Sequence, residues 1–307
     1  MTVIGGVSKE KKLLNDPFYA ISRAAEARRV FSEFVDRVTN GMLKNDGTDE
    51  LLSLIDKCVL GTDDVKFIKS IKKNTKLYRA RVLNPEDISL EKGIHVTKEG
   101  KLSGFNESES REAPLGFATE GRNNIKGVSY FYASNRPVTA CCEVKPGVRQ
   151  LVSLAEFSVV DTMHVVDFST DKTFEVDDKI SLGRLFTDIM FMYSRPVSND
   201  EEYRATQILT DYIRKSGVDG ICYKSFFDAT GVNYTIFNSD HRRIKYLSSS
   251  ILLFQSERKT FMDVNEKKVI QAESVGGASF DIQVQSSTVA SVIKTLADND
   301  SKGSKQR

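Results

Sequence analysis

The stretch Gly121–Glu143 has the sequence GRNNIKGVSYFYASNRPVTACCE, and it places three unusual side chains on short segments that favour β-structure. Arg122 follows a glycine, Tyr132 lies near the end of an aromatic run, and Glu143 follows Ala-Cys-Cys. Ionisable groups are costly inside a core unless they are paired or functional. A Glu on an apolar run lies either on the solvent face of a helix or in a functional site, and the residues alone favour neither interpretation.

Length and composition narrow the class of protein. With 307 residues and 40% hydrophobic content, the chain can bury a sizeable core, as one large domain with extensions or as two modest domains. Its net charge of +2 comes from 44 basic and 42 acidic residues. Because the charges nearly cancel, we expect no direct nucleic-acid partner and no membrane partner, and an anionic ligand must be bound by a local cluster.

The cysteines, the N-terminal sequence and the lengths of the apolar runs all bear on the cellular compartment of the protein. The four cysteines have neither the paired spacing of a metal site nor the density of a disulfide scaffold. The stretch from Met1 to Lys12 turns charged after seven residues, which is too early for a secretory signal. No apolar run reaches the roughly 18 residues of a membrane span. We therefore expect a reduced, cytoplasmic protein.

Residues 1–75 are predicted to form a helical region. Asp16-Pro17 is a helix start signal, and apolar residues from Phe18 to Val38 recur at spacings near three and four. A second amphipathic pattern spans 51–60, and a short third helix is predicted around 65–71. The apolar stripe is interpreted as packing rather than as a partner-binding groove. A further hypothesis is that this region regulates the rest of the chain in cis.

From Lys76 the pattern changes to short strands and turns. Leu77–Val82 alternates, with Tyr78 and Ala80 on one side and Arg79 and Arg81 on the other, and residues 84–120 are predicted to form a long loop or small turns. Further strands are predicted at 128–133, 150–157, 163–168, 221–224, 233–237 and 251–254, and helices at 138–144, 180–192, 201–215 and 288–297. Residues 298–307 are polar and predicted to be disordered.

Common catalytic motifs are missing from the sequence. It contains no glycine-rich dinucleotide or phosphate loop, no HExxH, no GxSxG and no EF-hand loop. This disfavours Rossmann oxidoreductases, P-loop NTPases, zincins and α/β-hydrolases. The three histidines, His95, His164 and His241, are far apart in the sequence, so we expect no catalytic metal site.

Several blocks, in their order, carry a resemblance to a known family. They are Leu77-Tyr78-Arg79-Ala80-Arg81, Gly121-Arg122-Asn123-Asn124, Gly127–Ala133, Thr139–Val144, Tyr203–Gln207, Gly217–Ser225 and Gly231–Phe237. Together they resemble the RES domain, over about Lys76 to Phe237. The family is named for an Arg, a Glu and a Ser, which correspond here to Arg122, Glu143 and Ser225. The chain departs from the family at Asn123, where a bulky apolar residue is usual, and this concerns local packing more than chemistry.

The resemblance implies a fold class and a domain organisation. The expected fold is α+β, an ADP-ribosyltransferase-like split β-sheet around a cleft that binds NAD. The chain is then divided into an N-terminal helical region (1–75), the RES domain (76–248), a C-terminal extension (249–297) and the tail (298–307). Members of the family are typically toxins of bacterial toxin–antitoxin pairs that degrade NAD by hydrolysis or phosphorolysis, and the neutralising partner is usually a small helix-turn-helix antitoxin.

The resemblance also implies site residues, with NAD as substrate and no true cofactor. The catalytic candidates are Arg122, Tyr132, Glu143 and Ser225. The NAD-binding candidates are Tyr78, Arg79, Arg122, Asn124 and Ser225. Cleavage of the nicotinamide–ribose bond builds positive charge at the anomeric carbon, which the Glu143 carboxylate would stabilise. Guanidinium groups match phosphate oxygens, so Arg79 and Arg122 would bind the pyrophosphate or a phosphate nucleophile.

Each candidate has a simpler explanation beside the functional one. Arg79 could be an exposed residue of a sheet edge, and Arg122 could pair with Glu120 or cap a turn. Tyr130 and Tyr132 share a face, as a packed aromatic pair would, and Ser225 could begin a turn. Two alternative functions also stay open: ADP-ribosylation of a protein, for which residues 84–120 could supply a docking surface, and nucleotide sensing without turnover.

Overall fold

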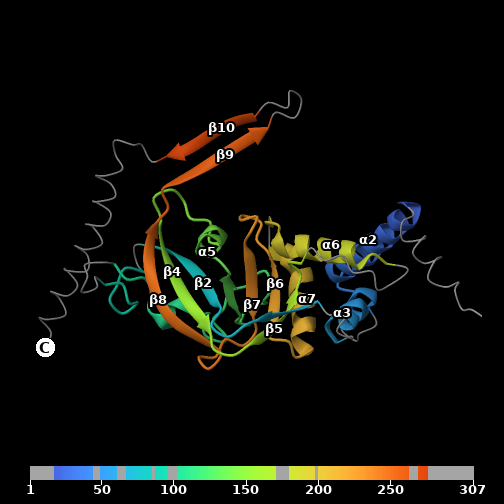
Figure 1. Cartoon of the computed structure of the whole chain (residues 1–307), viewed down its shortest axis with the longest axis horizontal. Coiled ribbons are helices and arrows are strands. Elements are labelled where there is room, and N and C mark those ends of the chain that lie inside the picture. Colours follow the sequence, from blue (N-terminus) through green and yellow to red (C-terminus); the bar gives the residue numbers. More distant parts are fainter. Residues whose placement is uncertain are drawn as a thin grey trace, which may run out of the picture. The chain divides into compact units, whose positions relative to one another are not determined.

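The computed structural model describes residues 17–43, 49–60, 67–84, 87–95, 102–170, 180–197, 200–262 and 269–275 (Figure 1). The helix predicted at 288–297 and the predicted disordered tail lie outside these residues. In the described part of the chain, none of the helices combines the length and the apolarity that crossing a bilayer requires.

The chain divides into two compact units. The first contains Met1–Lys72, Ala113–Tyr132 and Thr162–Ser239, and the second contains Lys73–Glu112, Ala133–Asp161 and Asp240–Arg307. Strand β3 (Phe131–Ser134) begins in the first unit and ends in the second. The remaining strands of the sheet fall into two groups, one in each unit, which agrees with the split sheet of the predicted α+β class.

The first unit combines helices with short strands. Its helices are α2 (Pro17–Thr39), α3 (Glu50–Leu60), α6 (Leu182–Ser194), the 3₁₀ turn η2 (Asp200–Tyr203) and α7 (Arg204–Lys215). Its strands are β1 (Ile68–Ile71), β5 (Met163–Asp167), β6 (Gly220–Lys224) and β7 (Val232–Ile236). β5 and β6 pair in parallel, and the other two pairs, β1 with β5 and β6 with β7, are antiparallel. The long connection from β5 to β6, which contains α6 and α7, suits a parallel pair.

The predicted third helix around 65–71 is wrong, because Ile68–Ile71 is strand β1. Ile68 lies opposite Val166 and Ile71 opposite Met163, so the strand is stabilised by a partner about 95 residues away. A four-residue segment with apolar residues at both ends suits one helical turn as well as a short strand. The distant pairing decided between them.

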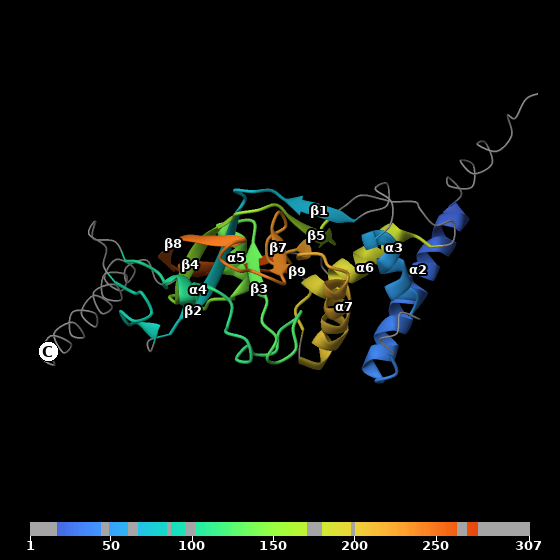
Figure 2. The ribbon, with the colours of Figure 1, turned by 90° about the horizontal axis from the view of Figure 1, so that it is seen from below.

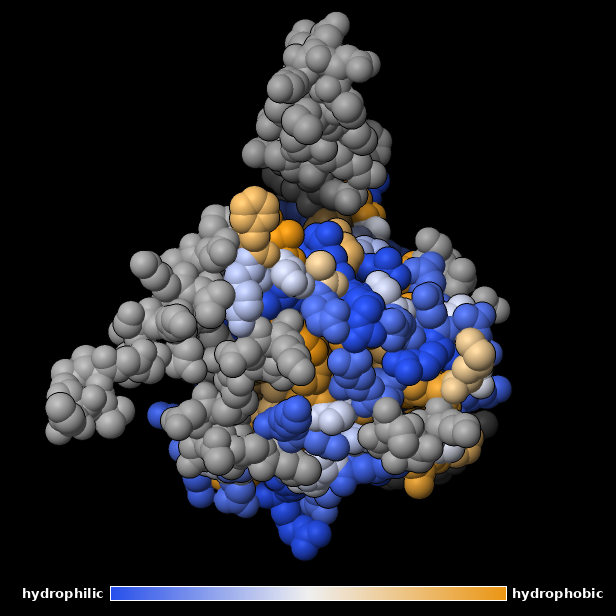
Figure 3. All heavy atoms as spheres, turned by 90° about the vertical axis from the view of Figure 1, so that its right-hand side faces the viewer, coloured by the Kyte–Doolittle hydropathy of each residue, from blue (hydrophilic) through white to orange (hydrophobic). Residues whose placement is uncertain are grey.

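The apolar stripe of α2 is core packing along most of the helix, as predicted, but its first residues, Phe18 and Ile21, are 82% and 65% exposed. Ala27, Val30, Phe34 and Val38 are at most 1% exposed. They belong to one hydrophobic cluster with residues of α3, α6 and α7 and with Val166, Ile221 and Tyr223 of the strands. Figure 2 shows these four helices side by side. Hydrophilic residues cover most of the described surface on the α2 and α3 side of this unit (Figure 3). The N-terminal helices are therefore part of the first unit's core.

The second unit is built on three long antiparallel strands. β2 (Lys76–Leu83) pairs with β4 (Leu151–Val159), and β4 pairs with β8 (Ile244–Leu253). Two short helices, α4 (Glu107–Ser110) and α5 (Pro137–Glu143), accompany them, and β9 (Ser256–Met262) pairs with β10 (Val269–Val275). β8 begins seven residues before the predicted strand at 251–254, because its polar first half hides the strand pattern. The predicted boundary at 248 falls inside β8, and the four-part division stays a prediction.

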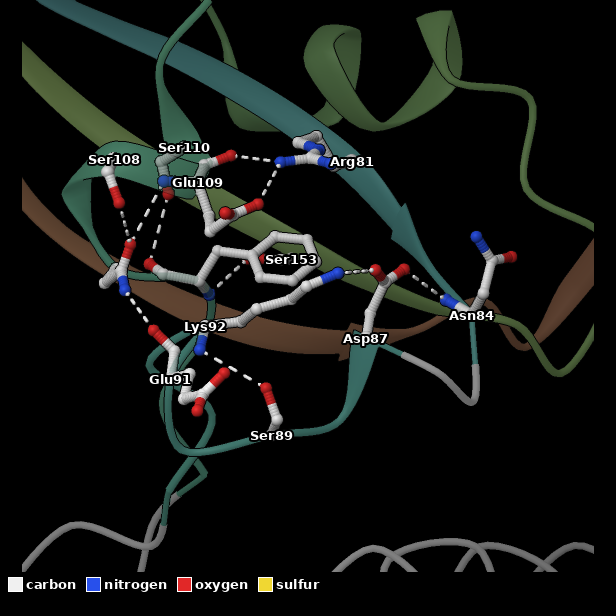
Figure 4. Close-up of polar contacts among 12 residues, drawn as sticks. Arg81, Asn84, Asp87, Ser89, Glu91, Lys92, Ser108, Glu109, Ser110 and Ser153 are labelled. Atoms are coloured by element: carbon white, nitrogen blue, oxygen red, sulfur yellow. Dashed lines mark hydrogen bonds and ion pairs between the residues drawn. The ribbon is translucent and has the colours of Figure 1, made fainter. Parts of the chain in front are cut away.

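The segment after β2 is irregular, as predicted, and hydrogen bonds hold its described residues in place (Figure 4). The Asp87 carboxylate accepts from the backbone N–H of Asn84 at 2.9 Å and pairs with Lys92 Nζ at 2.7 Å. Asn106 caps α4 by accepting from the backbone N–H of Glu109 at 3.0 Å. The Arg81 guanidinium binds the Glu109 carboxylate at 3.1 Å. These contacts connect the segment to β2.

Candidate functional site

The Gly121–Asn124 turn of the first unit is held by a residue of α7. Gly121 and Asn124 exchange backbone hydrogen bonds of 3.0 and 3.3 Å. Gln207 Nε2 donates to the backbone oxygens of both, at 2.9 and 3.3 Å. Figure 2 shows the green segment that contains this turn beside α7. Gln207 was not among the predicted site residues, although the block Tyr203–Gln207 belongs to the resemblance.

Tyr132 and Asn124, two of the predicted site residues, bond to each other. The Tyr132 hydroxyl donates to Asn124 Oδ1 at 2.6 Å and accepts from the backbone N–H of Asn123 at 3.2 Å. Asn124 Nδ2 donates to the backbone oxygens of Thr119 and Ile125. Because both ends of this amide are engaged, Asn124 holds the turn and Tyr132 in place. Its predicted contact with NAD stays a prediction.

Arg122 lies on this turn with its charge uncompensated by the described residues. Its side chain is half-buried, Nη1 donates to the backbone oxygen of Met192 at 3.2 Å, and the guanidinium lies 5.2 Å from the centroid of the Tyr203 ring. No described carboxylate forms an ion pair with it. Glu120 instead accepts from Gln207 Nε2 at 3.0 Å. The simpler explanation, a pair between Arg122 and Glu120, is therefore wrong.

Ser225 follows β6 and begins a turn. Its hydroxyl oxygen accepts from the backbone N–H groups of Phe227 and Asp228 at 3.1 and 3.2 Å, and the residue is buried. The simpler explanation of Ser225 is therefore confirmed, and a catalytic role in addition stays a prediction.

Tyr130 packs in the interior, whereas Tyr132 bonds to the Gly121–Asn124 turn. It is buried, and its ring centroid lies 5.1 Å from that of Phe237 at a tilted angle. Burial raises the pKa of its hydroxyl. The predicted packing role therefore applies to Tyr130, while Tyr132 is half-buried and bonded to the turn.

In the second unit, α5, which ends at Glu143, packs on the face of β2 that carries Tyr78. Ala80, Ala140 and Val152 form a small cluster against which Tyr78 and Val144 pack. Glu143 is the last residue of α5 and is half-buried. Because side chains alternate along a strand, Arg79 lies on the opposite face of β2 from Tyr78. On that face its neighbour Arg81 lies over Phe105, 4.7 Å from the ring centroid.

Among the described residues, the Cys141 thiol is not activated and the cysteines and acidic residues form no metal site. Burial, and secondarily the neighbouring Cys142, raises the pKa of Cys141 to about 11, so this thiol is protonated at neutral pH. In the described part of the chain, no group of three or more His, Cys, Asp or Glu side chains is placed to hold a metal ion.

The comparisons with known proteins agree with the resemblance found in the sequence. Residues 103–254, about half of the chain, match the family model described as RES domain. The matched segment contains Arg122, Tyr132, Glu143 and Ser225, whereas Tyr78 and Arg79 precede it. A search of curated proteins found no significant match.

One solved structure shows a distant similarity. It is the crystal structure of the M.tuberculosis MbcT-MbcA toxin-antitoxin complex, matched at 13% sequence identity and a TM-score of 0.37. The match covers 66% of this chain and 92% of that chain. This similarity is too low to support a conclusion about either fold or function. The family assignment comes from the sequence match: residues 103–254 of this chain belong to the RES domain family.

Proposed function

We propose that this protein cleaves the nicotinamide–ribose bond of NAD, by hydrolysis or by phosphorolysis. The observation that best supports this function is Arg122, a half-buried guanidinium on a braced turn, with no ion pair to any described carboxylate. A partly buried cation in such a position favours an anionic ligand, and the pyrophosphate of NAD is one. Membership of residues 103–254 in the RES domain family supports the same function.

The proposed chemistry assigns a role to each candidate side chain. Bond cleavage gives the ribose oxocarbenium character, and the Glu143 carboxylate stabilises this charge while nicotinamide departs. Water or inorganic phosphate then attacks the anomeric carbon. Arg122 and Arg79 are the candidates for binding pyrophosphate or the phosphate nucleophile.

The remaining candidates position the substrate. Tyr132 stacks on nicotinamide or orients the ribose, and Tyr78 is a second candidate for the same work. Ser225 forms a hydrogen bond to the nicotinamide–ribose part of NAD. Asn124, whose amide is engaged in the turn, acts through Tyr132 in this proposal. NAD is the substrate, and the reaction needs no separate cofactor.

The deciding experiment measures nicotinamide release from NAD by the purified protein, with and without inorganic phosphate. Glu143→Gln keeps the shape of the side chain and removes its charge, so we expect a loss of about 100-fold or more in kcat. Glu91→Gln, an exposed carboxylate on the segment after β2, is the matched control and should keep full activity. A folded wild-type protein that releases no nicotinamide would overturn the proposal, and a requirement for phosphate would indicate phosphorolysis.

A second candidate function, ADP-ribosylation of a protein, is favoured by one surface feature. Leu115 and Phe117 are 82% and 81% exposed on the segment between α4 and β3. The backbone there is fixed, because the Gly116 N–H donates to Gly127 O and the Gly127 N–H donates to Ala118 O. Both glycines have positive φ, near +87° and +86°. Apolar side chains on an ordered loop are typical of protein contacts. Transfer of label from NAD to a protein would support this function.

The cellular setting is proposed from the family. As a member of a toxin-like family, the protein would act in the cytoplasm and be neutralised by an antitoxin, of helix-turn-helix type if it follows the usual pattern. Co-purification of one defined protein that suppresses NAD cleavage would support this. Binding of NAD without any turnover would instead indicate a nucleotide sensor.

A further inference from the structure

A cavity of about 730 Å³ lies in the first unit, between the segment 120–130 and α7. Asn123, Tyr130, Gln207 and Asp211 are among its lining residues. Of the residues proposed above for NAD, only Asn124 lines it. The volume is within the range of about 300–1,000 Å³ that small-molecule sites occupy.

Gln207 presents an unused acceptor at this cavity. The residue is only 6% exposed, and Nε2 donates to Glu120, to Gly121 and to Asn124. These three oxygens fix the orientation of the amide, since the reversed amide would place Oε1 against them. Oε1 accepts no hydrogen bond from any described residue. An amide oxygen to which no described protein group donates can accept an N–H group from a ligand in the cavity.

Some other polar groups of the wall are acceptors as well. Glu120 and Asp211 add two carboxylates. Asp211 is already paired with Arg214 and Lys215, each at 2.8 Å. Glu120, with a single bond from Gln207, is therefore the carboxylate that remains available for a cation.

The apolar part of the wall suits the body of such a ligand. Ile125, Val128 and Ile208 are aliphatic, and the buried Tyr130 contributes an aromatic side chain. A guanidinium is planar, carries five N–H donors, pairs with carboxylates through two parallel bonds and stacks on aromatic rings. Its aliphatic stem packs against apolar side chains.

We infer that this cavity is a binding site for a guanidinium-bearing ligand, with the N–H groups directed to Glu120 and to the amide oxygen of Gln207. Two sources share this chemistry: free arginine or a derivative of it, and an arginine side chain of a peptide. Arg204 also lines the cavity and has no carboxylate partner among the described residues. It can pair with the carboxylate of a free amino acid, which a peptide-bound arginine lacks.

The test is a calorimetric titration of the full-length protein in the absence of NAD, so its outcome does not depend on the proposed function. The probes are L-arginine, L-citrulline, L-lysine and Nα-acetyl-L-arginine methylamide. We expect saturable binding of at least one arginine probe, with a Kd at least about tenfold below those of citrulline and lysine. Citrulline has the same shape without the charge, so equal affinity for it would overturn the assignment. Tighter binding of lysine, or no saturable binding of either arginine probe, would also overturn it.

Variants and the two arginine probes locate the site and its natural ligand. Glu120→Gln can still accept from Gln207 and should weaken arginine binding about tenfold, and Ile125→Trp, at an exposed wall position, should abolish it by filling space. Asp36→Asn, an exposed carboxylate on α2, is the control and should leave the Kd unchanged. Unchanged binding in both wall variants, with folding verified by circular dichroism, would contradict the site.

The two arginine probes distinguish the natural ligand. Tighter binding of free arginine, lost in Arg204→Gln, indicates a free amino acid. Tighter binding of the capped probe, Nα-acetyl-L-arginine methylamide, indicates an arginine side chain of a peptide.

Discussion

The guanidinium of Arg122 lies over the ring of Tyr203, 5.2 Å from its centroid, and donates to the backbone oxygen of Met192. The hydroxyl of Thr206, on the adjoining helix α7, bonds to the backbone oxygen of Arg122 at 2.5 Å. Arg122 is therefore held in position through both its guanidinium group and its backbone oxygen. Such preorganisation lowers the entropy lost when an anion binds.

Replacing Arg122 by Lys should lower kcat/KM for NAD cleavage at least about tenfold. Lysine keeps the charge but loses the planar fork and the stacking on Tyr203. Arg28→Lys, on the exposed face of α2, is the matched control and should be unaffected. Steady-state release of nicotinamide measures both variants. Wild-type kinetics in Arg122→Lys would exclude bidentate binding by this residue.

Tyr132→Phe should lower the free energy of unfolding by about 1–3 kcal/mol, because Asn124 Oδ1 loses its donor in a largely buried position. Urea denaturation at neutral pH measures the change. Tyr203→Phe keeps its ring over Arg122 and removes a hydroxyl that bonds to no described residue, so it should change stability much less. Equal effects of the two substitutions would show that the Tyr132 bond does not stabilise the turn.

Phe34→Ala should destabilise the protein by about 3–5 kcal/mol, since this ring is fully buried among helices α2, α3, α6 and α7. Phe18, on the same helix, is 82% exposed, and Phe18→Ala should change stability by no more than about 0.5 kcal/mol. Thermal or urea unfolding distinguishes them. A small loss in Phe34→Ala would mean that α2 packs weakly on the first unit.

The position of α2 and α3 also changes how regulation in cis can be tested. Deleting residues 1–70 removes both helices and most of β1, together with a large part of the first unit's core. We expect this truncated chain to unfold rather than to gain activity. A folded, more active truncated protein would support the regulatory hypothesis instead.

The stability of the first unit should fall as pH rises above about 10. Burial, and then the 2.6 Å hydrogen bond to Asp56 of α3, raises the pKa of Tyr212 from 10.0 to about 12. The folded state thus holds this proton more tightly than the unfolded chain. Its contribution to stability is complete below pH 10 and is lost as pH rises toward 12. Urea titrations from pH 8 to 12 should show a shallower decline in Tyr212→Phe than in the wild type. Parallel curves would contradict the prediction.

The elements predicted most accurately are those whose stabilising pattern is local. The helices α2 and α3 and the strand β2 follow from periodicity in a single stretch of sequence, and the cap of α3 by Asp49 is local as well. The strand β1 and the first half of β8 were missed, because β1 is too short to show a period, the first half of β8 is polar, and both depend on pairing with distant strands, β5 and β4. Pairing energy of this kind has no signal within the segment itself.

For the candidate site, too, some features could be predicted from the sequence and others could not. Residue types and block order, by resemblance, indicated Arg122, Tyr132, Glu143 and Ser225, and the family match contains all four. Neither type nor order could show that Gln207 holds the turn, that Glu120 bonds to Gln207 rather than to Arg122, or that Ser225 Oγ caps a turn. These facts depend on which side chains meet in space.

The amino-acid sequence by itself determined the family, the α+β class and the identity of the candidate residues, because these depend on residue type, order and short-range periodicity. Only the tertiary structure decided that the N-terminal helices belong to the core of the first unit, that Arg122 has no ion pair to a described carboxylate, and that a cavity lined with acceptors lies beside its turn. Packing, pairing and burial are set by contacts between segments far apart in the chain, and such contacts leave no mark in any one stretch of sequence.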